Sequence, residues 1–352
     1  MCTRKRALVF VTGLLFLFAA ASAAWADSNT AVISNPYEGI NWATVGAYKG
    51  NFHTHTNRDG GTMTPAATID AYKAFGDTVL AITDHNLVTW PWTDYGRNPA
   101  TLGMVAVQGN EISNCDNIGS FFTNYTSGTS DPVVALAGIQ AAGGASIINH
   151  PGRYTKTAQW YATQYQTYSS LIGMEVYNQG NRYPGDVQKW DQVLMLTMPD
   201  RPIWGFANDD EHSISHVGLN WNVLLLSEFT GSAVRTAMEG GSFFFSTTKY
   251  STLPLTGGTP PVITGIAVDN VNGLISLSAT GYGEVHWVSD GSVVSHSLTL
   301  DLRNTPGIGD YVRAEMFSNG GSTYTQPFTT PEPATMILLA LGGLLALKRH
   351  RQ

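Results

Sequence analysis

Side chains that can bind metal ions follow directly after short apolar segments at five places in the chain. The segments and the side chains that follow them are 48–52 with His53 and His55, 80–83 with Asp84 and His85, 105–110 with Glu111, 146–149 with His150, and 204–207 with Asp210 and His212. If the segments are parallel strands of one α/β unit, their carboxyl ends meet on one face. The pattern therefore predicts that dispersed polar side chains form a single site.

The region 45–250 alternates short apolar runs with longer mixed segments. The runs 78–83, 104–108, 145–149, 173–177 and 203–207 are typical of buried strands, and 65–75 and 132–142 are typical of helices. Strands that alternate with helices favour a parallel α/β sheet or barrel. The fold class expected for this region is therefore α/β.

The character of the chain changes after residue 250. A segment rich in proline and glycine at 254–261 is typical of a linker. Beyond it, strands are expected at 262–268, 274–279, 284–288, 296–302 and 311–317, with hairpin turns at Asn272-Gly273 and Asp290-Gly291. Residues 262–330 are therefore expected to form a small all-β sandwich.

The first residues have the pattern of a signal peptide. Arg4, Lys5 and Arg6 precede an apolar run over 7–24, and Ala24-Trp25-Ala26 supplies small residues for a cleavage point. A signal peptide over 1–26 is therefore expected, with an uncleaved anchor as the alternative. Cleavage would leave Cys115 as the one cysteine, without an internal disulfide, which fits export in a bacterium.

The last residues have three parts in a fixed order. Pro331-Glu332-Pro333 precedes an apolar run over 334–347 and a basic end over 348–351. The run is shorter than the roughly 20 residues of an ordinary transmembrane helix. This end, 331–352, resembles the PEP-CTERM sorting signal, with a simple tail anchor as the alternative. The resemblance implies processing by an exosortase and a location in the periplasm, outer envelope or cell surface of a Gram-negative bacterium, with membrane contact only through the terminal segments.

The spacing of the candidate ligands suits metal coordination. His53 and His55 are two residues apart on an extended segment, so both side chains point to the same side, and Asp210 and His212 repeat this spacing. Glu111 has two oxygens with which to bridge two ions. Mixed histidine and carboxylate ligands suit Zn, Mn or Fe. Two or three such ions would clamp a phosphate and activate a water as nucleophile.

Together the motifs resemble the PHP (polymerase and histidinol phosphatase) family. The segments that carry the resemblance are 51–60, 82–86, 109–113, 149–153 and 210–212. The resemblance implies a distorted seven-stranded (β/α) barrel over residues 46–250 with a di- or trinuclear metal centre. It implies one ion at His53, His55, Glu111 and Asp210, a second at Asp59, His85 and His212, and a third at Glu111 and His150.

The chain departs from the family pattern at one position, since Ser120 stands where many members have a histidine. The third ion position is therefore expected to be weak, completed by water, or empty. Arg153 is a candidate to grip a phosphate oxygen, or else a plain surface residue. Asp84 is a candidate to orient His85 or to act as general acid, or else to cap the turn. Glu175 and Asn178 are expected to support the ligands.

The resulting hypothesis is an exported, metal-dependent hydrolase of phosphate mono- or diesters. The expected substrate is a small phosphate ester or a glycan-linked phosphate, because a net charge of −7 without basic patches argues against long nucleic acids. One alternative is an amidohydrolase-like enzyme that cleaves C–N or C–O bonds, although no lysine stands at a strand end as that class commonly requires. The other is a non-catalytic matrix protein of the cell surface.

Overall fold

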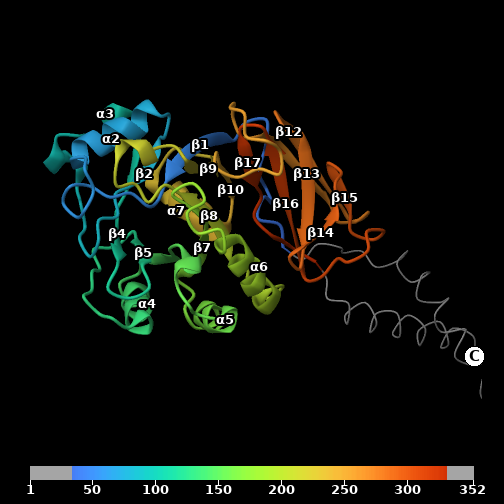
Figure 1. The fold of residues 1–352 in the computed structure, drawn as a ribbon, viewed down its shortest axis with the longest axis horizontal. Helices are drawn as coiled ribbons and strands as arrows, with labels where there is room; N and C mark the ends of the chain where they lie inside the picture. Colours follow the sequence, from blue (N-terminus) through green and yellow to red (C-terminus); the bar gives the residue numbers. More distant parts are fainter. Residues whose placement is uncertain (1–33, 331–352) are drawn as a thin grey trace, which may run out of the picture.

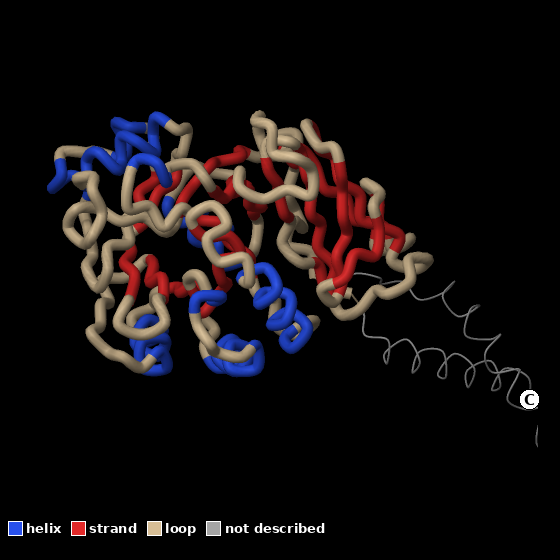
Figure 2. The backbone as a smooth tube through the Cα atoms, viewed as in Figure 1, coloured by secondary structure: helices blue, strands red, loops and turns tan. Residues whose placement is uncertain are grey.

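A computed structural model describes residues 34–330 of the chain (Figure 1). The expected signal peptide over 1–26 and the expected sorting segment over 331–352 lie outside the described residues. Within 34–330, no helix is both long enough and apolar enough to cross a membrane. Figure 2 shows one half of the molecule with helices around its strands and a second half made of strands and loops.

Three strands near the start of the described chain form a parallel ladder. β1 (Gly46–Asn51) pairs with β2 (Val79–Ala81), and β2 pairs with β3 (Val105–Val107). On its other side β1 pairs antiparallel with β9 (Asn220–Leu226), which pairs antiparallel with β10 (Phe243–Thr247). The expected strands 78–83 and 104–108 are therefore present, and β1 carries the chain directly toward His53 and His55.

A second sheet contains five strands in chain order. They are β4 (Gly109–Ile112), β5 (Ile118–Phe121), β6 (Ala145–Ile148), β7 (Leu171–Asn178) and β8 (Trp204–Asn208). β6, β7 and β8 run parallel, whereas β5 runs antiparallel to both of its neighbours. The parallel order expected from the sequence therefore holds for β6, β7 and β8, and the sheet as a whole is mixed. The connection between β4 and β5 is too short for a crossover and permits only antiparallel pairing.

Helices follow most of the strands of this half. They are α2 (Pro65–Ala74), α3 (Pro99–Leu102), α4 (Pro132–Ala141), α5 (Ala158–Thr167), α6 (Asp186–Thr197) and α7 (Gly231–Gly240), with short 3-10 turns η2 (Trp92–Tyr95), η3 (Pro151–Arg153) and η4 (Ile214–His216). Thr64 and Asp131 cap α2 and α4 by accepting a hydrogen bond from a backbone N–H, and proline follows each cap. These caps explain why both predicted helices begin where expected.

The remaining strands form two layers. β11 (Val262–Asp269), β12 (Leu274–Thr280) and β15 (Thr299–Asp301) make a three-stranded sheet. β13 (Glu284–Ser289), β14 (Ser292–Ser295), β16 (Tyr311–Ser318) and β17 (Gly321–Tyr324) lie in the large sheet, and β18 (Phe328–Thr329) pairs with β16. Ile275 and Leu300 of the first layer and Trp287 and Met316 of the second belong to one buried cluster. Apolar side chains from both layers therefore share one core.

The strands on either side of the expected linker belong to one sheet of ten strands. β17 pairs antiparallel with β10, and Phe245 of β10 lies opposite Tyr324 of β17 with their rings stacked 5.2 Å apart. The side chain of Gln326 also accepts a hydrogen bond from the backbone N–H of Gly205 and donates one to its carbonyl, each at 2.8 Å. The two halves are thus joined by backbone pairing.

The overall class is mixed α/β, and the seven-stranded barrel and separate sandwich remain predictions.

Candidate metal centre

Two histidines enter the site from the segment that follows β1, and both are fully buried. The Nε2 atom of His53 lies 3.1 Å from Oε1 of Glu111 and 3.4 Å from Oδ1 of Asp210. The Nε2 atom of His55 lies 3.2 Å from the same Asp210 oxygen and 3.6 Å from Oε2 of Glu111. Two imidazoles and two carboxylates from three separate strand ends therefore face one another.

Glu111 lies within β4 itself, so the strand ends after this ligand and not before it. A single parallel bridge pairs it with His85, which follows β2. The Nε2 atom of His85 lies 2.9 Å from Oε2 of Glu111, and Nε2 of His150 lies 3.5 Å from Oε1. Together with His53 and His55, four histidines surround this one buried carboxylate.

Asp59 and His212 complete the set of eight predicted ligands. The Oδ2 atom of Asp59 lies 2.5 Å from Nδ1 of His85 and 3.9 Å from Nδ1 of His55. The Nδ1 atom of His212 lies 3.5 Å from Oδ1 of Asp210, and its ring centroid lies 4.4 Å from that of His55. The structure therefore brings all eight residues into one continuous cluster.

Two of the eight ligands have a left-handed backbone. His150, between β6 and Pro151 of η3, has φ of 30°, and Asp210, after β8, has φ of 46°. Such a backbone costs a side-chain-bearing residue about 1–3 kcal/mol and persists only where the surroundings hold it. The backbone N–H of His150 is held by a hydrogen bond to Oε2 of Glu175 at 2.8 Å. Strained residues of this kind concentrate at functional sites.

Glu175 of β7 accepts hydrogen bonds from two of the candidate ligands, His53 and His150. Its buried carboxylate accepts hydrogen bonds from Nδ1 of His53 at 2.8 Å and from the side-chain amides of Asn178 and Asn208 at 3.0 Å. A carboxylate on one ring nitrogen fixes the tautomer and the orientation of a metal-binding histidine. Glu175 therefore leaves Nε2 of His53 facing Glu111 and Asp210. The supporting role expected for Glu175 and Asn178 agrees with these contacts.

The charges of the site are strongly coupled. Burial alone would lower the pKa of His53, but the carboxylates of Glu111, Glu175 and Asp210 outweigh it and raise this pKa well above its ordinary value. Burial would raise the pKa of Glu111 and of Asp210, and the neighbouring histidines instead hold both well below their ordinary range. The two carboxyl groups are therefore ionised at neutral pH, which is the charge state that a cation requires.

Several buried polar atoms of the cluster have no hydrogen-bond partner. They are Nδ1 of His55 and Nδ1 of His150, together with Nε2 of His55 and Oε2 of Glu111, which lie 3.2 and 2.9 Å from a neighbouring candidate ligand without the geometry of a hydrogen bond. Buried polar atoms are normally paired, and an unpaired one carries a desolvation penalty of about 1–3 kcal/mol. Imidazole and carboxylate donors suit Zn, Mn or Fe, so the residues present fit divalent metal ions.

Ligand atoms within 4.8 Å of one another form overlapping groups. The groups at the site are His53, His55 and Asp210; His53, Glu111 and His150; His55, His85 and His212; and His55, Asp59 and Asp84. His53 and His55 each belong to more than one group, whereas the family resemblance assigned each of them to a single ion. The group around His150 includes His53, which the resemblance did not place there.

Ser120, at the position of the expected histidine, lies fully buried on β5 opposite Asn110 of β4. Its hydroxyl has no hydrogen-bond partner. The amide nitrogen of Asn117 lies 3.5 Å from Nε2 of His150, in addition to Glu111 at the same distance.

The two candidate catalytic residues lie in different surroundings. Asp84 is fully buried and accepts hydrogen bonds from the backbone N–H of Thr56 at 2.6 Å, the Thr56 hydroxyl and the Thr89 hydroxyl. The carboxylate beside the His85 ring is that of Asp59 and not that of Asp84. Arg153 is exposed at the end of η3, with its guanidinium 5.7 Å from the Tyr154 ring centroid. Within the described residues it forms no ion pair with the cluster.

Sequence reasoning did not single out Arg182. Its Nη1 atom lies 3.9 Å from Oδ2 of Asp210, and its guanidinium lies 5.3 Å from the Tyr183 ring centroid. The Tyr183 ring in turn lies 5.5 Å from that of His150. Its position in the sequence could have identified it, because this arginine follows β7 and the candidate ligands also follow strands.

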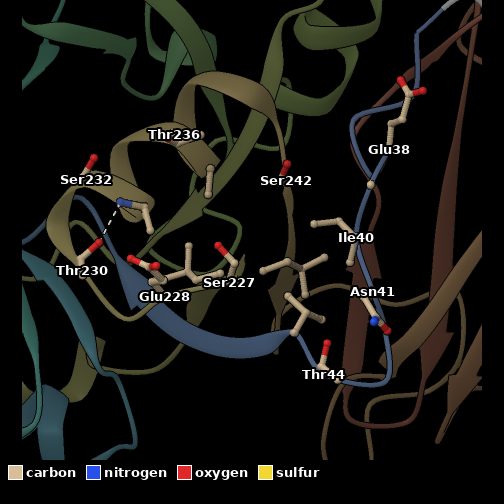
Figure 3. A pocket seen from close by; sticks show the side chains of 16 residues that line it. Glu38, Ile40, Asn41, Thr44, Ser227, Glu228, Thr230, Ser232, Thr236 and Ser242 are labelled. Atoms are coloured by element: carbon tan, nitrogen blue, oxygen red, sulfur yellow. Dashed lines mark hydrogen bonds between the residues drawn. The ribbon is translucent and has the colours of Figure 1, made fainter.

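A cavity of about 620 Å³ lies elsewhere, between the N-terminal segment and α7. Figure 3 shows Ile40 and Asn41 on one side of it and Ser232 and Thr236 on the other. Leu226 also lines it and pairs with the first residue of β1, whereas the candidate ligands His53 and His55 follow the last residue of that strand. None of the eight predicted ligands lines it, so this cavity is separate from the metal cluster.

Residues 329–352 match the family model of the PEP-CTERM protein-sorting motif. This motif indicates export and surface sorting in Gram-negative bacteria and processing by an exosortase. No curated protein matches the chain.

Several solved structures resemble the chain at low identity. One is a two-domain protein from Bacteroides vulgatus containing a predicted PHP-like metal-dependent phosphoesterase, at 15% identity and a TM-score of 0.47, covering 87% of this chain and 92% of that one. An amidohydrolase from Chromobacterium violaceum has 16% identity, a TM-score of 0.37 and coverage of 47% and 87%. A lesion-specific endonuclease from Pyrococcus furiosus has 13% identity, a TM-score of 0.40 and coverage of 55% and 56%. The chain thus carries a PEP-CTERM sorting motif, and its structural neighbours include PHP-like metal-dependent phosphoesterases.

Proposed function

We propose that this chain is an exported, metal-dependent hydrolase of phosphate mono- or diesters. The observation that carries the proposal is the convergence of five histidines and three carboxylates whose buried atoms include several without a hydrogen-bond partner. The eight residues are His53, His55, Asp59, His85, Glu111, His150, Asp210 and His212. Ions of Mn, Zn or Fe are the expected cofactors, two or three per chain.

The proposed ligand sets follow the groups of neighbouring atoms. His53, His55 and Asp210 would hold one ion, and His85 and His212, with Asp59 beside His85, a second. Glu111 would bridge to a third, with His150 as its other ligand. Divalent ions so bound lower the pKa of an attacking water and stabilise the charge that develops on phosphoryl oxygens.

The burial of the ligands indicates the side from which a substrate enters. The side chains of His53, His55 and Glu111 are inaccessible, whereas those of Asp59, His85 and His212 are 27%, 29% and 31% exposed. A phosphate ester would therefore approach the edge formed by Asp59, His85 and His212.

Arginines near this cluster supply positive charge that the chain lacks overall. Arg182 lies beside Asp210, and Arg58 donates a hydrogen bond to Thr89, which itself contacts Asp84. A guanidinium is suited to phosphate oxygens because it offers paired donors. Arg153 could bind a phosphate oxygen if its exposed side chain turns toward a bound substrate. In that case Arg153→Ala would raise KM.

The test is the double substitution His53→Ala/His55→Ala. The wild-type chain is expected to release phosphate or alcohol from aryl phosphate esters when Mn or Zn is added, and the variant is expected to lose both turnover and the metal ions of this cluster. Glu239→Gln on the exposed face of α7 is a control, because among residues 34–330 its side chain forms an ion pair with Arg235 alone. Retained turnover in the double variant would overturn the proposal.

Two other functions share parts of this site. Hydrolysis of C–N or C–O bonds by an amidohydrolase-like centre would show as turnover of aryl amides or carboxylic esters in preference to phosphate esters. Glu111, and not a lysine, lies among the histidines, which favours phosphate esters. A non-catalytic matrix protein would be purified without stoichiometric transition metal at the cluster of eight residues. Elemental analysis of the mature chain separates that outcome from both enzymes.

A further inference from the structure

A second group of metal-binding side chains lies on the β13–β14 hairpin, in the half of the molecule away from β2 and β4 (Figure 1). Glu284 and His286 belong to β13, and His296 directly follows β14. One ligand atom from each residue lies within 4.8 Å of the others. None of the three belongs to the metal centre described above.

Strand geometry explains why the three side chains meet. Glu284 and His286 are two residues apart on β13 and therefore share one face, while Trp287 points into the core between the two layers. Trp287 pairs with Ser295 across the hairpin, which places His296 next to His286. The two imidazole rings lie 4.7 Å apart between centroids and nearly perpendicular, at 86°.

The surroundings hold two of the three side chains in place. Nε2 of His286 lies 2.9 Å from Oε1 of Glu284, and the His286 ring packs 5.0 Å from that of Phe317 between centroids. The other Glu284 oxygen accepts a hydrogen bond from the Thr252 hydroxyl at 2.5 Å. These two hydrogen bonds, from Thr252 and then His286, lower the pKa of Glu284, so its carboxylate carries a charge at neutral pH.

His296 is the informative member of the group. Its side chain is exposed, and it meets no hydrogen-bond partner among residues 34–330. An ion pair between His286 and Glu284 would account for those two residues without any metal. That ion pair would not account for the His296 ring, which lies edge-on against the His286 ring. Within the part of the chain that the structure describes, both ring nitrogens of His296 are free for a ligand.

We propose that Glu284, His286 and His296 bind one divalent transition metal ion, of the zinc class, independently of the metal centre. Two imidazoles and one carboxylate are a ligand set that zinc accepts, and water would take the remaining position. β14 is the edge strand of the large sheet, and Glu284 accepts a hydrogen bond from Thr252 in the connection between β10 and β11. Bound zinc would therefore brace the edge hairpin, and the stabilisation grows with the logarithm of free zinc once this exceeds the dissociation constant.

The test counts zinc ions on the full mature chain. Protein stripped with a chelator is dialysed against buffered free zinc, and bound zinc is measured by elemental analysis. His286→Gln/His296→Gln is expected to bind one ion fewer than the wild type, while turnover of aryl phosphate esters changes less than twofold. Ser295→Ala is the matched control on the same hairpin and is expected to retain every ion. An unchanged ion count and an unchanged zinc affinity in the double variant would overturn the proposal.

A single substitution tests the same site if the double variant does not fold. His296→Gln alters an exposed side chain and is expected to weaken zinc binding at this site at least tenfold by titration calorimetry. The same substitution placed in the His53→Ala/His55→Ala background separates this site from the metal centre. Loss of zinc from that background supports the hairpin site even if the proposed phosphoesterase activity is absent. If His296→Gln binds zinc there as tightly as its parent, the hairpin site is refuted.

Discussion

At the scale of single residues, Glu175 shows how a side chain outside the ligand set governs the site. It receives the Nδ1 hydrogen of His53 and the backbone N–H of His150. We expect Glu175→Gln to weaken zinc binding about 10- to 100-fold, because the amide offers a single acceptor and no charge to orient these two ligands. Calorimetric titration of the metal-free protein checks this.

The control for this substitution is Glu239→Gln, which makes the same chemical change on the exposed face of α7. Far-ultraviolet circular dichroism should show an unchanged fold in both variants. Zinc affinity equal to that of the wild type in Glu175→Gln would show that His53 keeps its orientation without this carboxylate.

The protonation of His53 predicts how metal affinity depends on pH. Its pKa is raised, so the metal-free site holds a proton that a metal ion must displace, whereas the lowered pKa values of Glu111 and Asp210 keep both ionised. Zinc affinity should therefore rise with pH while His53 titrates, by about tenfold per pH unit for one displaced proton. Calorimetry in buffers of different ionisation enthalpy measures the released proton. Affinity that stays constant between about pH 6 and 8 would contradict this prediction.

At the scale of elements, a buried ion pair joins α6 to β16. Asp191 of α6 accepts hydrogen bonds from Nε and Nη2 of Arg313 at 2.8 and 2.7 Å and from the Tyr311 hydroxyl at 2.8 Å. The Arg313 side chain is 1% exposed. Arg313 keeps its second ion pair, with Glu315, when Asp191 is neutralised, but its Nε and Nη2 donors lose a charged acceptor. We therefore expect Asp191→Asn to lower the free energy of unfolding by ~1–3 kcal/mol. Urea denaturation measures it.

The exposed pair of Arg235 and Glu239 on α7 provides the comparison. Its loss in Glu239→Gln should cost about 0.3–0.5 kcal/mol, because water screens the two charges. A loss in Asp191→Asn as small as this would mean that Arg313 reaches water once its partner is gone.

At the scale of the whole molecule, the pairing of β10 with β17 predicts that the two halves do not fold separately. A chain that ends at residue 258 would leave β10 without β17 and would expose Phe245 and Tyr177, which pack against Tyr324. Unpaired apolar strand edges associate with one another. We expect the truncated protein to be oligomeric or insoluble in size-exclusion chromatography. A monomer that unfolds cooperatively would show instead that the α/β half is autonomous.

Much of the local structure was predictable from the sequence. The strands at 78–83, 145–149 and 173–177 are apolar runs bounded by polar residues, and they correspond to β2, β6 and β7, respectively. β5 was not among the expected strands, and the pairing of β10 with β17 was not predictable. Hydrophobic periodicity reports which face of a strand is buried, and it says nothing of which distant strand lies alongside.

The sequence by itself determined which side chains could bind metal and that most of them stand at strand ends. Only the tertiary structure decided how they group: Glu111 lies among four histidines, Asp59 and not Asp84 lies beside the His85 ring, and the Arg153 guanidinium lies over the Tyr154 ring. The physical reason is that ligands from different strands meet through strand order and register. Both are set by packing between segments far apart in the chain, while residue spacing governs only neighbours on one strand.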